Sequence, residues 1–299
     1  MLGYRHCFHA GNAADTLKHM VLIFCLDYLR QKEKPFLCVD THGGRGLYRL
    51  DNREWEDGVG RLMGAGGLPP MAERYLRLCL EEAGQEDLGT GAAGGALLYR
   101  GSPGIMKALI RPGDRLVCFE LHPGDYPALK EFLEGPSGGP RSSRGGPAAA
   151  GKAEARREDG PGGLRGLLPP PSGRGLILID PSWELKTDYG EIPQRLEEAL
   201  KRFPQGIYIL WYPLLKKPPE EGFPEALKKI QFRRRCRVEI YTPGPVRGNS
   251  PRGMYGSGLF VYNPPWTLKA ALEETLPVLA ARMGAGGEGW RLRWEPEAG

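Results

Sequence analysis

Three short apolar runs in this 299-residue sequence each end in a carboxylate. The runs are Pro35–Asp40, Arg115–Glu120 and Gly175–Asp180. Continuous apolar runs of this length predict buried parallel strands. Because ligands of open α/β sheets bind beyond the carboxyl ends of the strands, we expect the three carboxylates to face one crevice. A capping or turn role explains any one of these acids, but it explains all three together less well.

The third run leads into the motif Asp180-Pro181-Ser182-Trp183, which suits the binding of an exocyclic amine of a nucleobase. Such an amine is a poor nucleophile because its lone pair is delocalised into the ring. We expect the Asp180 side chain and the Pro181 carbonyl to accept its two N–H bonds, and Trp183 to stack on the extruded base. The alternative is a strand-ending turn with a tryptophan in the core.

A second motif of this type, Asn263-Pro264-Pro265-Trp266, matches the pattern better but has a worse position. It follows the last apolar run, 258–262, which we expect to be antiparallel to its neighbours. The end of that strand then points away from the crevice. We therefore interpret this second motif as a structural turn.

The glycine-rich turn at 43–46 allows the backbone to approach a ligand closely. Its spacing does not match the dinucleotide fingerprint, which has an acidic residue about 20 positions later. A nicotinamide cofactor is therefore disfavoured. Glu120 can still bind ribose hydroxyls if residues 49–98 are an insertion.

A metal site is not expected, because the cluster of His6, Cys7 and His9 lacks a second pair of ligands at the usual spacing. The six cysteines show no paired spacing, which favours buried free thiols and a cytoplasmic location. No apolar run approaches the roughly 20 residues needed to cross a bilayer. The net charge of +5 fits either a phosphate-binding surface or a solvated face rich in arginine. The arginines at 233–237 fit either an edge-strand device against aggregation or a phosphate contact.

The order of elements predicts an α/β sheet with right-handed crossovers. Further strands are expected at 206–211, 236–241 and 258–262, and helices at 12–30, 71–83, 123–133, 189–203 and 224–230. Two segments interrupt this alternation. Residues 49–98 are expected to form a small inserted helical subdomain, which leaves 1–48 and 99–299 as the main domain. Residues 135–151, rich in Gly, Pro and Ser, are expected to form a flexible loop.

The sequence as a whole resembles the RlmJ family of 23S ribosomal RNA adenine-N6 methyltransferases, which use S-adenosylmethionine. The most specific part of the resemblance is the N-terminal run from Tyr4 to Asn12. The other matching segments are 17–19, 35–37, 40–44, 101–103, 120–123, 159–160, 174–181, 186–189, 211–213, 252–254 and 263–266.

The resemblance implies a class I S-adenosylmethionine-dependent methyltransferase fold, with a seven-stranded, mostly parallel sheet whose last strand is antiparallel. It implies methylation of the N6 amine of an adenine in 23S rRNA, adenine 2030 in the usual numbering of that RNA. Asp180, Pro181 and Trp183 would be catalytic, and Tyr4 and His6 would contact the RNA. The residues implied to line the cofactor site are Lys18, His19, His42, Ser102, Glu120, Asp159, Gly160 and Asp180.

One departure from the family concerns the catalytic motif, where Asp-Pro-Pro-Tyr is replaced by Asp-Pro-Ser-Trp. Loss of the second proline leaves the backbone of Pro181 less restricted. The other departure is the 135–151 loop, which looks longer than the family needs. Two alternatives stay open: a DNA adenine-N6 methyltransferase, and a non-catalytic RNA-binding or cofactor-sensing relative. We expect the protein to be a monomer with 23S rRNA as its partner and no obligate protein partner.

Overall fold

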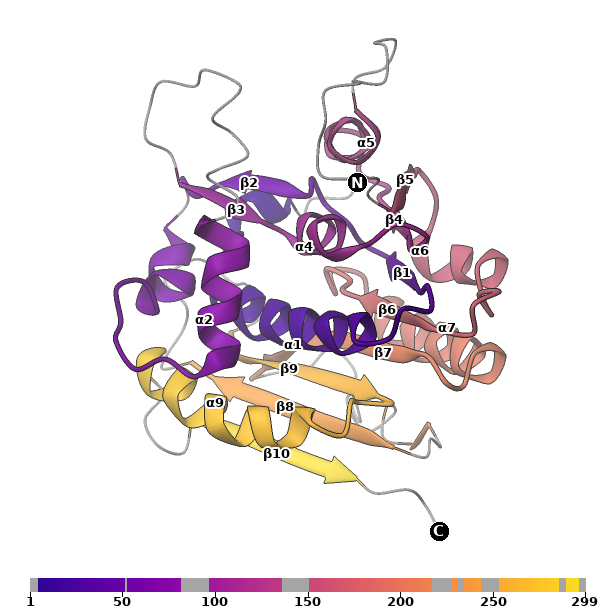
Figure 1. The fold of residues 1–299 in the computed structure, drawn as a ribbon. Helices are drawn as coiled ribbons and strands as arrows, with labels where there is room; N and C mark the ends of the chain where they lie inside the picture. The colour runs from indigo at the N-terminus through magenta and orange to yellow at the C-terminus, as the bar shows by residue number, and fades with distance from the viewer. Residues whose placement is uncertain are drawn as a thin grey trace.

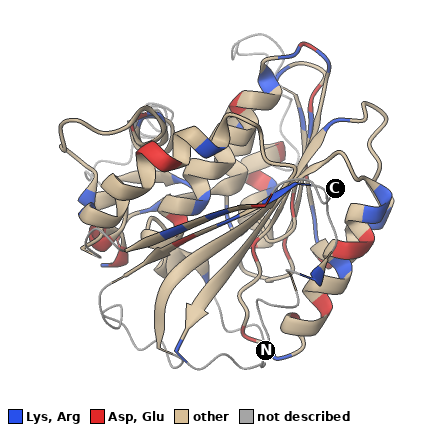
Figure 2. Ribbon diagram, turned by 90° about the horizontal axis from the view of Figure 1, so that it is seen from below, with Lys and Arg blue, Asp and Glu red and all other residues tan. Residues whose placement is uncertain are grey.

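The computed structural model describes residues 5–51, 53–81, 97–135, 151–216, 227, 229–230, 234–242, 253–284 and 289–295. A large twisted sheet lies at the centre, with helices on both of its faces (Figures 1 and 2). Its strands are β1 (Leu37–Asp40), β4 (Arg115–Phe119), β5 (Lys152–Arg156), β6 (Gly175–Ile179), β7 (Ile207–Leu215), β8 (Arg235–Tyr241), β9 (Met254–Tyr262) and β10 (Trp290–Glu295).

The strand order is β10-β8-β9-β7-β6-β1-β4-β5. The five strands from β5 to β7 in this order are parallel to one another, whereas β9 is antiparallel to both β7 and β8. This arrangement confirms the expected class I fold, including the antiparallel strand at 254–262. The sheet has eight strands rather than seven, because β10 adds to the outer side of β8. The charged Arg291 and Arg293 alternate with apolar residues in β10, so that it shows no continuous apolar run.

The pairing of β10 with β8 corrects the interpretation of the arginine cluster as an edge-strand device. β8 is an interior strand, and its arginines are engaged within the sheet. Arg235 forms an ion pair with Glu295 of β10. The Arg237 Nε donates to the Tyr212 hydroxyl at 2.7 Å, and that hydroxyl donates to Glu239 at 2.8 Å.

The helices are α1 (Ala13–Arg30), α2 (Pro70–Leu76), α4 (Ser102–Leu109), α5 (Tyr126–Glu134), α6 (Gly160–Gly163), α7 (Asp188–Arg202) and α9 (Leu268–Arg282). Short turns are η1 (His6–Phe8), η2 (Glu54–Asp57), η3 (Val59–Arg61), the π-helical η4 (Arg77–Glu81) and η6 (Leu164–Gly166). The expected helix at 224–230 lies mostly outside the described residues.

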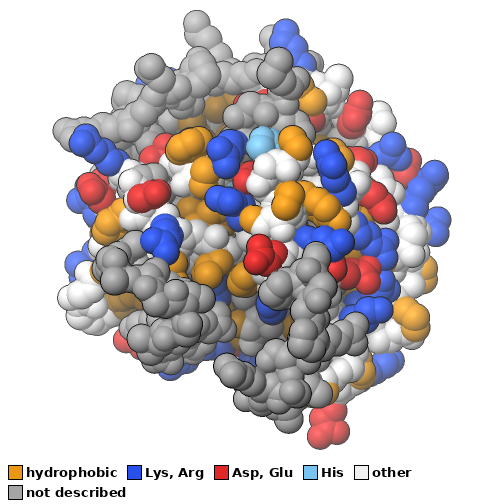
Figure 3. All heavy atoms as spheres, turned by 90° about the horizontal axis from the view of Figure 1, so that it is seen from above, with side chains coloured by type: hydrophobic (Ala, Val, Ile, Leu, Met, Phe, Trp, Pro, Cys, Tyr) orange, Lys and Arg blue, Asp and Glu red, His pale blue; other side chains and the backbone are white. Residues whose placement is uncertain are grey.

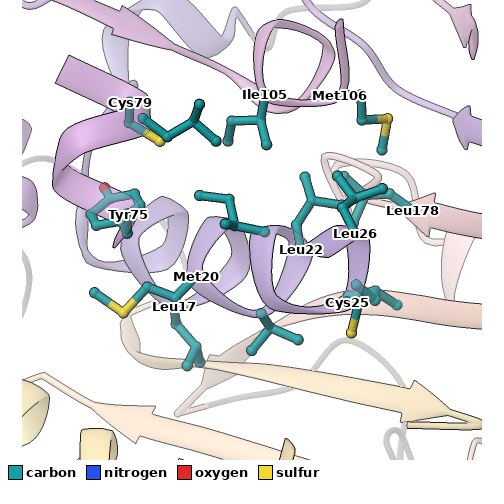
Figure 4. Close-up of a cluster of buried hydrophobic side chains, with 14 of the residues drawn as sticks. Leu17, Met20, Leu22, Cys25, Leu26, Tyr75, Cys79, Ile105, Met106 and Leu178 are labelled. Atoms are coloured by element: carbon teal, nitrogen blue, oxygen red, sulfur yellow. The ribbon is translucent and has the colours of Figure 1, made fainter. Parts of the chain in front are cut away.

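Helix α1 packs at the centre of the larger hydrophobic core. Asn12 caps it, since the Asn12 side chain accepts the backbone N–H of Asp15 at 3.0 Å. Its apolar side chains meet α4 on one side and the sheet on the other (Figure 4). Burial on two sides explains why nearly every residue from 14 to 26 is buried. The helix is thereby fixed relative to the ends of the strands.

The strands contribute side chains to a core on each face of the sheet. In β1, Cys38 joins the core around α1, and its neighbours Leu37 and Val39 join the core that contains α7 residues. This alternation is the period of two expected of a strand buried on both faces.

The segment expected to be an insertion begins and ends at a two-stranded antiparallel ribbon. β2 (Leu47–Arg49) pairs with β3 (Leu98–Arg100). Between them, the described residues form short helices and turns, and Tyr75 of α2 packs in the same core as α1. That residues 49–98 form a subdomain separate from the main domain stays a prediction. Residues 82–96, and 136–150 of the expected flexible loop, lie outside the described part of the chain.

Charged side chains of both signs are mixed on the described surface. On the face seen from above, Lys and Arg side chains are interspersed with Asp, Glu and apolar ones (Figure 3).

All six cysteines are free, and five of them are buried. Among the described helices, none has the length and hydropathy needed to span a membrane.

Candidate functional site

The three strand-end carboxylates lie at the ends of adjacent strands, because β6, β1 and β4 are neighbours in the sheet. Asp40 is fully buried, and Glu120 and Asp180 are half-buried. Thus the three acidic groups lie together at the carboxyl edge of the parallel strands, as expected.

Asp180 forms an ion pair with a lysine from the opposite side of this edge. The Lys18 Nζ donates to Asp180 Oδ2 at 2.5 Å and also lies 2.8 Å from Asp15 Oδ1. Burial of Lys18 disfavours its charge, but Asp15 and Asp180 outweigh that effect and raise the pKa of the ammonium. Asp180 Oδ1 makes no hydrogen bond within the described part of the chain, so it is available as an acceptor.

The N-terminal motif lies directly over this ion pair. His6 Nε2 lies 2.9 Å from Asp15 Oδ2, and the Gly11 amide donates to the same oxygen at 2.9 Å. His9 Nδ1 lies 2.9 Å from a carboxylate oxygen of Glu54 in η2, and Asn12 donates to that oxygen at 3.1 Å. Residues of the expected insertion therefore hold the motif in place.

Glu120 and the glycine-rich turn form the next wall of the site. The Gly44 amide donates to Glu120 Oε2 at 2.8 Å, and the His122 amide donates to Oε1 at 2.7 Å. Burial raises the pKa of Glu120, although these two amides oppose the shift. Gly44 has a φ of +61°, and a Cβ there would lie 2.1 Å from the Tyr48 hydroxyl. Glycine at this position allows the turn to close on Glu120.

Asp159 and Gly160 follow β5 and contribute through a helix cap and a close backbone contact. The Asp159 side chain caps α6 by accepting the Gly162 amide at 2.8 Å. A Cβ on Gly160 would lie 2.0 Å from the Thr41 carbonyl oxygen. The segment after β5 is therefore packed against the segment after β1, where His42 lies.

Asp40 carries a buried oxygen with unmet hydrogen-bonding capacity. The His42 amide donates to Asp40 Oδ1 at 3.1 Å, whereas Oδ2 has no hydrogen-bond partner among the described residues. Burial raises the pKa of Asp40 to about 6. The Ser102 side chain, buried at the start of α4, opposes this rise in pKa through a hydrogen bond to the carboxyl. A ligand that donates hydrogen bonds would satisfy Oδ2.

Two of the expected site residues are turned into the core, and a third is not described. The His19 ring is buried, its Nδ1 lies 2.6 Å from the Tyr99 hydroxyl, and burial lowers its pKa to about 3. Trp183 is 2% exposed, with its indole N–H donating to the Trp211 carbonyl at 3.1 Å. This is the placement of the core tryptophan that we kept as the alternative, and stacking by Trp183 stays a prediction. Tyr4 lies outside the described residues.

The second motif lies at the opposite edge of the sheet, as expected from its strand. β9 is antiparallel to β7, so Asn263 follows it at the edge where the parallel strands begin. The Asn263 side chain donates to the carbonyls of Pro204 and Gly206 at 2.6 and 2.7 Å. These contacts join two loops and are those of a structural turn. Within the part that the structure describes, no cluster of three potential metal ligands is found.

Asp15 is a residue that the sequence analysis missed. The sequence pattern gave no reason to place Asp15 in the site, because an acidic residue in the first turn of a helix is ordinary. The available signal was its spacing of three from Lys18, which puts the two side chains on one helical face.

Comparisons with known proteins agree with this geometry. The family model described as ribosomal RNA large subunit methyltransferase D, RlmJ, matches residues 33–296. The chain is 36% identical to ribosomal RNA large subunit methyltransferase J of Haemophilus influenzae, with 98% of this chain and 99% of that protein covered. It is also 36% identical to the protein of the same name from Escherichia coli, with 97% and 96% covered.

A similar solved structure is that of protein LPL1258 from Legionella pneumophila. It has a TM-score of 0.78 and 32% sequence identity, and the match covers 97% of this chain and 99% of that one. The sequence and the fold both match these proteins over nearly the whole chain, and the chain therefore belongs to the RlmJ family of ribosomal RNA large subunit methyltransferases.

Proposed function

We propose that the protein transfers a methyl group from S-adenosylmethionine to the exocyclic N6 amine of an adenine in 23S ribosomal RNA. The observation that carries the proposal is the buried Lys18–Asp180 pair at the carboxyl end of β6, in a chain that belongs to this family. Asp180, its partner Lys18, and Pro181 are the groups that we assign to the reacting amine.

The acidic edge of the sheet suits S-adenosylmethionine, which carries an ammonium and a sulfonium. Asp40 Oδ2 is a buried acceptor without a hydrogen-bond partner in the described part of the chain, and a hydrogen-bond donor of the bound cofactor would satisfy it. Glu120, held by two backbone amides, is directed to ribose hydroxyls, and Asp159 to the adenine amine of the cofactor. We place the cofactor between these groups, with Lys18, His42, Ser102 and Gly160 around it and the buried His19 behind them.

Asp180 has one oxygen for the lysine and one for the substrate. With Oδ2 bonded to Lys18, Oδ1 accepts one N–H of the adenine amine, and the Pro181 carbonyl accepts the other. Two acceptors orient the lone pair towards the methyl group, which the bound cofactor supplies on a sulfonium. The protein contributes orientation and electrostatic stabilisation as positive charge develops on the amine.

Lys18 serves as a fixed cation rather than as a base. Its pKa is raised, so the ammonium keeps its protons and cannot accept the one that the amine loses. That proton leaves through Asp180 Oδ1, the acceptor already in contact with it.

The substrate is tested by methyl transfer from labelled S-adenosylmethionine to 23S rRNA freed of ribosomal proteins, with the modified base mapped. Duplex DNA of similar length is the competing substrate. We expect label on N6 of one adenine of the RNA and none on DNA. Label on DNA would support the DNA methyltransferase, and binding of both RNA and cofactor without transfer would support the non-catalytic relative.

The cofactor assignment is tested separately by calorimetry. Glu120→Ala removes the contacts to the ribose hydroxyls, so we expect about 10- to 150-fold weaker binding of S-adenosylmethionine. Glu131→Ala, on α5, is the control on a solvent-exposed carboxylate. Equal affinities for Glu120→Ala and wild type would refute this placement.

The RNA-facing residues and the working state of the protein follow from the same proposal. We assign Tyr4 and His6 to the RNA at the mouth of the site, since His6 lies next to the Asp15–Lys18 pair. We propose that the protein acts as a monomer, and in the cytoplasm, where ribosomal RNA is made. Sedimentation of the protein with and without RNA tests the monomer.

A further inference from the structure

The carboxylate of Asp15 is a buried charge next to the catalytic motif. Its side chain is 1% exposed. Oδ2 is held by His6 Nε2 and the Gly11 amide, each at 2.9 Å. Oδ1 lies 2.8 Å from Lys18 Nζ, and burial, which disfavours its charge, is outweighed by the neighbouring cations so that its pKa is lowered.

The two oxygens of Asp15 have different partners. Gly11 and His6 fix the carboxylate from the side of the N-terminal motif, and its other oxygen faces the ammonium of Lys18. That ammonium bridges Asp15 Oδ1 and Asp180 Oδ2, and the Lys18 side chain is only 4% exposed. A lysine has a flexible four-carbon stem, so its direction depends on the partners at its end. Asp15 is the partner that does not itself meet the substrate.

We propose that Asp15 is a positioning residue for methyl transfer, which fixes Lys18 so that Lys18 holds Asp180 in the orientation that receives the amine. This inference rests on the proposed function and adds a residue to its machinery. It predicts an effect on the transfer step and little effect on the binding of either substrate, because Asp15 is shielded from both.

The test compares wild type with Asp15→Asn, which keeps the shape of the side chain and removes its charge. At saturating S-adenosylmethionine and 23S rRNA, we expect the single-turnover rate to fall about 10- to 150-fold, the size of loss typical of one buried contact between charged groups. By calorimetry, the affinity for S-adenosylmethionine should stay within about threefold, and the KM for RNA should change as little.

A matched control separates positioning from loss of stability. Asp114 is a second buried carboxylate, 2% exposed, which accepts the backbone amides of Phe36 and Arg111 before β4 begins. It therefore lies at the opposite edge of the sheet from Asp180. Asp114→Asn should lower the melting temperature and leave the rate per folded molecule unchanged. If Asp15→Asn also keeps its rate per folded molecule, the proposal is overturned.

A double variant covers the case in which Asp15→Asn does not fold. Lys18→Met with Asp15→Asn removes both charges, so that no ammonium is left facing a neutral amide. If Asp15 acts through Lys18, the double variant should transfer at the rate of Lys18→Met alone. A double variant at least tenfold slower than Lys18→Met would overturn the proposal. Absence of transfer by wild type itself would instead refute the proposed function.

Discussion

The protein contains the same kind of short motif twice, with opposite surroundings. Asp180-Pro-Ser-Trp183 follows the parallel strand β6, and its tryptophan is 2% exposed. Asn263-Pro-Pro-Trp266 follows the antiparallel strand β9, and its tryptophan is 73% exposed. Each motif has one residue with a left-handed backbone, Trp183 at φ +54° and Asn263 at φ +52°.

The difference teaches that strand direction decides which motif meets the site. Asp180 points to an edge where Lys18, Asp40 and Glu120 gather, whereas Asn263 joins two loops at the other edge. By residue pattern alone the second motif is the better match. A short motif therefore gains its meaning from the strand that carries it.

The largest expected effect separates the two tryptophans by stability. Trp183 is packed against Tyr189 at 4.9 Å between ring centroids, so Trp183→Ala should lower the free energy of unfolding by about 3–5 kcal/mol. Trp266→Ala should change it by less than about 0.5 kcal/mol. Urea unfolding of both variants and of wild type measures these changes in the free energy of unfolding. Equal losses would mean that the exposure of the two rings does not distinguish the motifs.

The next effect separates the two motifs by rate. Asp180→Ala removes an acceptor aimed at the transition state, so we expect a loss of at least about 100-fold in single-turnover rate. Binding of S-adenosylmethionine should stay within a few-fold. Asn263→Ala is the paired control, and it should keep the wild-type rate per folded molecule. A rate above one-tenth of wild type for Asp180→Ala would remove its catalytic assignment.

Asn263→Ala should instead destabilise the fold. It leaves the carbonyls of Pro204 and Gly206 without their donor and puts alanine in a left-handed conformation, at a cost of about 1–3 kcal/mol. Asn263→Gly loses the same donor without the backbone strain, so it should be the milder variant in thermal melts. The reverse order would show that the two hydrogen bonds are not what the turn needs.

The smallest effect comes from making the first motif more like the second. Ser182→Pro would restrict Pro181 to extended conformations and so fix its carbonyl as an acceptor. No hydrogen bond from the Ser182 amide is found in the described part of the chain, so the proline should remove none there. We expect a single-turnover rate equal to wild type or higher. A clear fall in a folded variant would mean that the site has its own geometry around Ser182.

Local pattern predicted the strands that carry the site, and long-range contacts decided the details. The runs ending in Asp40, Glu120 and Asp180 are continuous and apolar, which made their strands and their common edge readable from the sequence. The sequence left two placements of Trp183 open, stacking on the base or packing in the core. The choice depends on contacts with Tyr189 and with the Trp211 carbonyl, which form only in the folded chain. The roles of Asp15 and Glu54 were hidden for the same reason, since their partners come together only in the folded chain.

The position of β9 also has a consequence for how the chain folds as it is made. β7 is a nine-residue, largely apolar strand, and β9 covers the side of it that β6 does not. Because synthesis runs from the N-terminus, β7 is made before residues 254–262 exist to pair with it. An uncovered apolar strand edge invites pairing with other chains. The interval between the synthesis of β7 and that of β9 is therefore a stage at which this protein is exposed to aggregation.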